Sequence, residues 1–252
     1  AVGSSANSAA PMTVLNTIVA DQLIKFRKEV EAILEKGVKK ELAIMEVLKR
    51  YVKESKNIRF EGNGYSDEWV EEAARRGLSN LKTTPEALAV YARPESIELF
   101  TKHGIYSKEE MHARHEIELE NYVKKIQIES RVIGDMAINH IVSTSLKYQT
   151  QLVENVKGQK EIGIDPQYYA PTVEMIKKIS EYTSSIVRLQ NEMTEARKEA
   201  NNIEELEEKA TLYGTKVKGY FEEIRYAVDK LELIVDDDEW PLPKYRELLL
   251  IK

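Results

Sequence analysis

Apolar residues recur at helical spacing along nearly the whole chain, and the longest such run extends from about residue 107 to 157. Ser107 and Glu110 have the spacing of a capping box at its start, no proline interrupts it, and Gly158 marks its predicted end. At 1.5 Å per residue, such a helix spans roughly 75 Å. We therefore predict a long spine helix at 107–157, around which the other elements pack.

Two seams run along this predicted spine, each with steps of three and four residues. The first seam consists of Leu119, Tyr122, Ile126, Glu129, Ile133, Met136 and His140. The second consists of Ile128, Val132, Asp135, Asn139, Val142, Leu146, Gln149, Val153 and Val156. Because each seam needs a surface to pack against, the spine should have at least two packing partners.

Shorter helical runs lie on either side of the spine. Before it, we predict helices at 12–36 and 40–55, followed by short clasp helices that begin near Ser66, Thr84 and Pro94. At the other end, residues 240–252 begin with Trp-Pro-Leu-Pro, which predicts a rigid elbow followed by a last short helix.

The most regular heptad pattern lies at 166–235. Its first half carries apolar residues in alternating steps of four and three: Met175, Ile179, Tyr182, Ile186, Leu189, Met193, Ala196 and Ala200. A similar run follows Asn201-Asn202, and Asn202 with Glu205 has capping spacing. We therefore predict an antiparallel, coiled-coil-like helical hairpin. One continuous helix with a stutter is the alternative.

Composition agrees with an all-α fold, a bundle of long helices. Charged residues make up 32% of the chain, against only 7 prolines and 11 glycines. The net charge of −6, without a basic block, argues against nucleic acid as a partner. No apolar run approaches the roughly 18 residues that are needed to cross a membrane. We therefore do not expect a membrane as a partner. The absence of cysteine excludes thiolate chemistry and cysteine-ligated metal, and it fits a cytoplasmic location.

One metal-like spacing occurs, Glu109-x-x-His112. A di-iron bundle needs two such pairs and two further glutamates on facing helices, and the sequence has no second Glu-x-x-His. We therefore predict no metal site and no cofactor bound by these residues. No nucleophile elbow, dinucleotide fingerprint or Walker loop is present either, so we predict no catalytic residues.

Polar residues inside the spine are the main candidate site. Glu129, Asp135, Asn139 and His140 lie at seam positions, and Arg131 lies one turn before Asp135. Buried carboxylates need partners, so we predict a buried polar network. The network either fixes the register of the bundle or lines a ligand pocket between helices, and register is the favoured interpretation.

Four blocks of the sequence resemble the C-terminal region of type III glutamine synthetases, the large bacterial form. They occur in the same order and extend over the whole chain: AVGSSANSAAPMTVLNTIVADQL, GNGYSDEWVEEAARRGL, KKIQIESRVIGDMAINHI and WPLPKYRELL. The resemblance implies that residues 1–37 are the end of a catalytic-domain loop plus a first helix. It implies that residues 38–252 are the C-terminal helical domain.

The same resemblance implies the chemistry of a parent enzyme, which ligates ammonia to glutamate with ATP and Mg²⁺ or Mn²⁺. It also implies the partners, the catalytic barrel of the same chain and other subunits of a double-ring, dodecamer-like homo-oligomer. The catalytic residues of the family lie on that barrel, before Ala1, so none can be carried over. Ser4 and Ser5 would lie beside the parent's active site, without a catalytic role.

Two hypotheses follow for the chain itself. The first is a structural, oligomer-forming fragment of that enzyme, inactive alone, which the loop-like start and the missing initiator Met favour. The second is a stand-alone coiled-coil interaction protein without enzymatic activity. The sequence does not decide whether the helical domain is regulatory or only structural.

Overall fold

The structure is a computed structural model that describes residues 7–249, except for the side chains of Tyr245 and Arg246. The described residues are helical, with α-helices and short 3₁₀ and π segments, and they contain no strand. The predicted all-α fold is therefore confirmed. The chain divides into two compact units, Ala1–His115 and Glu116–Lys252, and each is described by itself. The boundary predicted after residue 37 stays a prediction.

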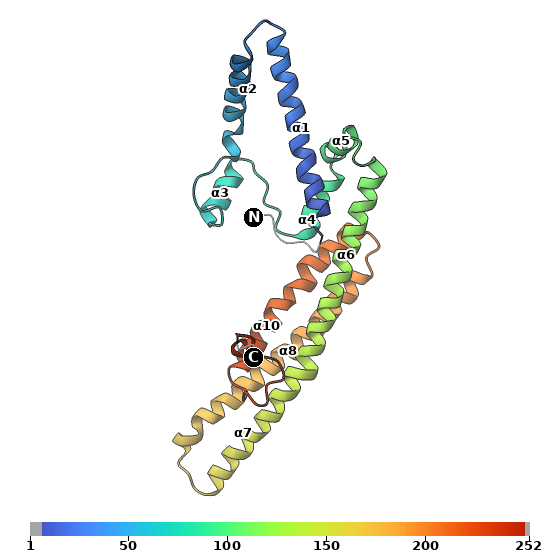
Figure 1. Cartoon of the computed structure of the whole chain (residues 1–252). Coiled ribbons are helices and arrows are strands. Elements are labelled where there is room, and N and C mark those ends of the chain that lie inside the picture. The colour runs from blue at the N-terminus through green and yellow to red at the C-terminus, as the bar shows by residue number, and fades with distance from the viewer. Residues whose placement is uncertain (1–6, 250–252) are drawn as a thin grey trace. The chain divides into compact units, whose positions relative to one another are not determined.

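The first unit contains two long helices and several short ones. Its elements are α1 (Ala9–Leu34), α2 (Lys40–Glu54), η1 (Ser55–Ile58), α3 (Asp67–Arg75), α4 (Thr84–Leu88), η2 (Ala89–Ala92), α5 (Pro94–Lys102) and the start of α6 (Lys108–Asp135). In Figure 1, α1 and α2 are the two blue helices at the start of the chain. They pack together through Val30 on α1 and Ala43 and Val47 on α2, all three buried.

Local sequence signals set the ends of these elements. Thr83 and Glu86 form a reciprocal capping box at the start of α4. Ser107 and Glu110 do the same before α6, where the Ser107 amide donates to Glu110 Oε2 at 2.8 Å and the Glu110 amide donates to Ser107 Oγ at 3.2 Å. This second box confirms the predicted start of the spine.

The second unit is built on longer helices. Its elements are the rest of α6, η3 (Met136–Val142), α7 (Ser143–Glu161), α8 (Pro166–Asn201), α9 (Leu206–Leu212), η4 (Tyr213–Val217), α10 (Lys218–Glu232) and α11 (Tyr245–Leu249). Residues 108–161 are thus helical without a break. Gly158, the predicted end, lies inside α7, and Gly163 with φ +81° follows the helix instead.

A turn at residues 202–205 separates α8 from α9, so the alternative of one continuous helix is wrong. Glu205, and not Asn202, caps α9: its carboxylate accepts from the amides of Glu207 at 2.9 Å and Glu208 at 2.5 Å. Lys216 pairs with Glu199 across the turn. The coiled-coil character of the pairing between α8 and α10 stays a prediction.

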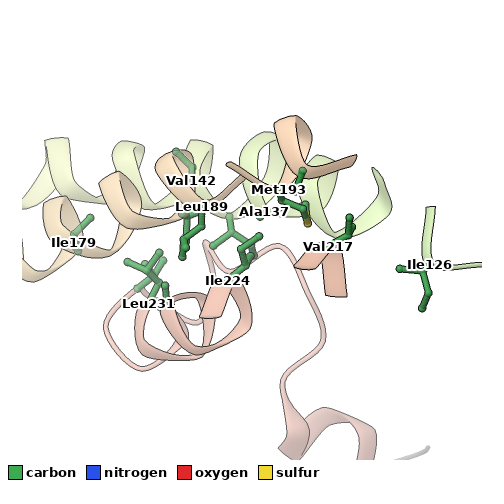
Figure 2. Packing of buried hydrophobic residues seen from close by; sticks show 14 of the residues in the cluster. Ile126, Ala137, Val142, Ile179, Leu189, Met193, Val217, Ile224 and Leu231 are labelled. Atoms are coloured by element: carbon green, nitrogen blue, oxygen red, sulfur yellow. The ribbon is translucent and has the colours of Figure 1, made fainter. Parts of the chain in front are cut away.

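The core of this unit lies between the α6–α7 helix, α8 and α10. Figure 2 shows Ala137 and Val142, Leu189 and Met193, and Ile224 facing one another from these three helices. Ile179, Ile186, Ile224 and Leu231 are fully buried. Trp240, in the predicted elbow, is buried against the same cluster, so the chain after α10 is held onto the core.

Candidate functional site

The middle of the α6–α7 helix contains η3, which is a π-helix. A π segment accommodates an extra residue per turn and is frequent at functional sites. Two consecutive residues of this segment, Ile141 and Val142, are both buried. Its polar residues, Asn139 and His140, face solvent.

Beside this segment lies an open groove of about 440 Å³ between α6–η3 and α8. Its lining residues are Ser130, Arg131, Gly134, Asp135, Ile138 and Asn139 from α6–η3, and Val187, Gln190, Asn191 and Arg197 from α8. At its floor, a Cβ on Gly134 would lie 3.4 Å from Gln190 Cγ and 3.6 Å from Met193 Cε. A glycine at this position therefore lets the α8 side chains approach the backbone of α6.

The structure corrects the expectation that the predicted polar network is buried within this chain. Arg131, Asp135, Asn139 and His140 are exposed, and Glu129 is half-buried beside Lys125 at 4.0 Å. For Asp135 and Asn139 the physical reason is that their part of the second seam faces solvent: Ile128 is 61% exposed and Val132 50%. Only one face of α6 packs against α8 and α10.

Three of the five predicted residues nevertheless meet in the groove. Asn139 Nδ2 donates to Asp135 Oδ1 at 2.5 Å, and Arg131 lines the same groove. Arg131 does not pair with Asp135, because none of the ion pairs among residues 7–249 includes it. Glu129 and His140 do not line the groove. The choice between register and ligand binding stays a hypothesis.

A second polar cluster lies one turn before Arg131 on α6, and sequence reasoning missed it. The hydroxyl of the buried Tyr213 donates to Asn201 Oδ1 at 2.7 Å, and Gln127 Nε2 donates to the hydroxyl at 3.3 Å. The signal in the sequence is a tyrosine at a core position of a heptad, because a buried hydroxyl needs a hydrogen-bond partner.

Charge around Tyr213 links this cluster to the groove. Burial raises the pKa of Tyr213, because a phenolate is poorly solvated there. The hydrogen bond from Gln127 and the positive charges of Arg197 and Arg131 act in the opposite direction and lower the pKa. Tyr213 therefore remains a neutral hydrogen-bond donor, and both guanidinium charges are near enough to act on its hydroxyl.

The first unit has its own charged centre at the buried Asp21. Its carboxylate lies 2.9 Å from Lys25 Nζ, 2.5 Å from Lys102 Nζ and 2.8 Å from His103 Nε2. These hydrogen bonds, with Lys102 first, hold the pKa of Asp21 well below its ordinary value of 3.8. Asp21 and Lys25 lie on α1, and Lys102 and His103 lie at the end of α5, so these ion pairs connect the two helices.

Comparison with known proteins identifies the family. A model of the glutamine synthetase C-terminal domain matches residues 43–160. A glutamine synthetase of Bacteroides fragilis is 48% identical over 255 residues, and a type-3 glutamine synthetase of Dictyostelium discoideum is 30% identical over 259 residues; both alignments cover 100% of this chain. The chain carries a glutamine synthetase C-terminal domain.

The predicted resemblance to the C-terminal region of type III glutamine synthetases is therefore confirmed. The chain spans about 35% of the length of these two relatives. A glutamine synthetase of Butyrivibrio fibrisolvens is 33% identical over 242 residues. The α6–η3 wall of the groove falls inside the region that the family model matches, whereas its α8 wall lies beyond residue 160. Ser4 and Ser5 lie outside the residues that the structure describes.

Proposed function

We propose that this chain is the C-terminal helical region of a type III glutamine synthetase and acts there as a structural, oligomer-forming element. The whole enzyme would join ammonia to glutamate with ATP and Mg²⁺ or Mn²⁺. This region would contact the catalytic barrel of its own chain and other subunits of a double-ring homo-oligomer in the cytoplasm. The proposal is supported by the similarity that extends over the whole chain.

The nucleotide and metal of the whole enzyme would be bound elsewhere. Within residues 7–249, no group of three histidine, aspartate or glutamate side chains is placed to hold a metal ion. The residues present therefore do not fit the metal centre that the family implies, and no catalytic step is assigned to them. No helix among the described residues is long and apolar enough to cross a membrane.

The observation that carries the contact role is the exposed apolar surface of α1 and α2. Exposed residues on α1 are Met12, Leu15, Ile18, Val19 and Leu23, and those on α2 are Leu42, Met45, Leu48 and Val52. Apolar residues repeat along both helices on faces that the core of this unit does not cover. Contiguous exposed apolar surface marks an interaction site, so these faces are proposed to pack against the rest of the enzyme.

The test compares the isolated chain with the full-length protein that contains it. Leu23 is 62% exposed, so Leu23→Asp should leave the unfolding of the isolated chain nearly unchanged, whereas it should lower the oligomeric mass and glutamine formation of the full-length protein. Lys28→Asp, on exposed surface of the same helix, is the control and should change neither property. Mass is measured by sedimentation, and activity by ATP-dependent glutamine formation.

Two results would count against the proposal. A full-length Leu23→Asp protein with normal mass and activity would remove α1 as a contact surface. A full-length wild-type protein that forms no glutamine from glutamate, ammonia and ATP would refute the enzymatic part. The stand-alone interaction protein would then become the better hypothesis.

A further inference from the structure

The groove between α6–η3 and α8 contains two arginines without a counter-ion. Among the residues that the structure describes, Arg131 and Arg197 make no ion pair or hydrogen bond. Neighbouring cations of α8 differ: Arg188 pairs with Glu192 at 2.8 Å, and Lys198 pairs with Glu195 at 2.7 Å. Arg188 and Lys198 on the exposed surface of α8 are thus neutralised by a neighbouring acid, and Arg197 in the groove is not.

The sequence around each arginine explains why neither has an ion-pair partner. The positions three and four residues from Arg197 on either side hold Met193, Thr194, Ala200 and Asn201, none of which is acidic. Arg131 has one acid at such a position, Asp135, but in the less favourable order for a helix. Asp135 accepts instead from the amide of Asn139.

The same groove therefore offers two guanidinium groups, one carboxylate and neutral amides, and the guanidinium groups are not paired with the carboxylate. The amides are those of Asn139, Gln190 and Asn191. Paired guanidinium groups suit a carboxylate, which they bind in a planar, often bidentate geometry. The carboxylate of Asp135 repels a plain anion and attracts a cation. A ligand that carries both charges close together matches this set.

We propose that this groove binds a free α-amino acid. Its carboxylate would contact Arg131 and Arg197, its ammonium group would contact Asp135, and a polar side chain would meet the amides. Gly134, which also lines the groove, is buried where α6 meets the α8 side chains Gln190 and Met193. The site lies entirely within the second unit, and its test needs no catalysis, so it stands independently of the proposed function.

Binding is measured by isothermal titration calorimetry on the 252-residue chain. The probes are L-glutamate and L-glutamine, with 2-oxoglutarate as the analogue that lacks the ammonium group and inorganic phosphate as a plain anion. At least one amino acid should bind, and the two plain anions should bind about tenfold more weakly or not at all, since a charge-assisted hydrogen bond is lost.

Three variants locate the site. Arg197→Gln and Asp135→Asn should each weaken amino-acid binding about tenfold or more. Arg188→Gln, on the same helix but already paired with Glu192, should leave it unchanged. Circular dichroism checks that each variant is folded. No loss of folding is expected, because Asp135 and Arg188 are exposed and Arg197 is only half-buried.

Several results would overturn the assignment. Absence of binding by both amino acids removes the site. Equal binding of 2-oxoglutarate or phosphate, with Asp135→Asn neutral or favourable, means a simple anion site. Unchanged binding in Arg197→Gln means that the amino acid binds elsewhere.

Discussion

Gly214 and Gly219 form a matched pair for testing how tightly the second unit is packed. Gly214 lies in η4, where an added Cβ would lie 2.8 Å from Tyr122 Oη and 3.6 Å from Tyr122 Cε1 and Cζ. Gly219 lies at the start of α10, where the same Cβ would meet nothing within 4 Å. Alanine should therefore be accommodated at Gly219 and should be less favourable at Gly214.

The magnitudes follow from two competing terms. Replacing glycine by alanine inside a helix raises the free energy of unfolding by about 1 kcal/mol. At Gly219 nothing opposes this, so Gly219→Ala should stabilise. At Gly214, overpacking against Tyr122 costs about 1–3 kcal/mol. Gly214→Ala should therefore be about 1–3 kcal/mol less stable than Gly219→Ala.

A rescue variant distinguishes the contact from a general effect of the π segment. Tyr122→Phe removes the oxygen at 2.8 Å and leaves ring carbons at 3.6 Å, an ordinary contact distance. Adding Tyr122→Phe to Gly214→Ala should recover most of the loss. The same substitution in the Gly219→Ala protein is the control for the effect of losing the hydroxyl alone.

The assay must report on the second unit only. The chain has two tryptophans, Trp69 in the first unit and the buried Trp240 in the second. In a Trp69→Phe background, tryptophan fluorescence during urea unfolding reports on the second unit. The reasoning is refuted if Gly214→Ala is as stabilising as Gly219→Ala, or if Tyr122→Phe fails to rescue it.

The remaining predictions concern charge and burial. Because the pKa of Asp21 is lowered, its ion pairs stabilise the first unit above pH 3.8, and this contribution is lost as the pH falls below that value. Asp21→Asn should abolish this acid dependence of stability. The measurement is unfolding at a series of pH values, followed by Trp69 fluorescence in a Trp240→Phe background. Ile186→Ala should lower the free energy of unfolding of the second unit by about 2–5 kcal/mol, whereas Val187→Ala, at a 40% exposed site, should change it by less than about 0.5 kcal/mol. Ser107→Ala should cost about 0.5–2 kcal/mol in chemical denaturation, because it removes the cap of α6.

Sequence reasoning recovered the all-α fold, and the regular core of α8 shows why. Ile179, Ile186, Leu189 and Met193 follow the predicted spacing and are all buried. A long amphipathic helix repeats one signal many times, so single irregular positions do not change the interpretation. Buried Ile186 and Leu189 also show that this seam serves the core of the chain itself.

The spine shows where the same reasoning failed. The first predicted seam placed Met136 and His140 inward, but Ala137 and Ile141, one residue later in each case, are buried. At the first position the pattern favoured the larger Met136 over Ala137, and a step of four from Met136 then led to His140 and passed over Ile141. The π segment adds a shift in register that no spacing rule anticipates.

The packed core of the second unit and the groove both lie where α6–η3 approaches α8 closely. Ser130 and Gly134 of α6 and Ala137 of η3 are small and buried, and the α8 side chains Gln190 and Met193 lie against the Gly134 position. The charged side chains of Arg131, Asp135 and Arg197 line the groove beside this contact. A change at Gly134 should therefore disturb packing and ligand binding together. Arg197 makes no hydrogen bond or ion pair with any described residue, so a change there should weaken ligand binding and leave packing unchanged. Comparing variants at the two positions therefore separates the effect on helix packing from the effect on ligand binding.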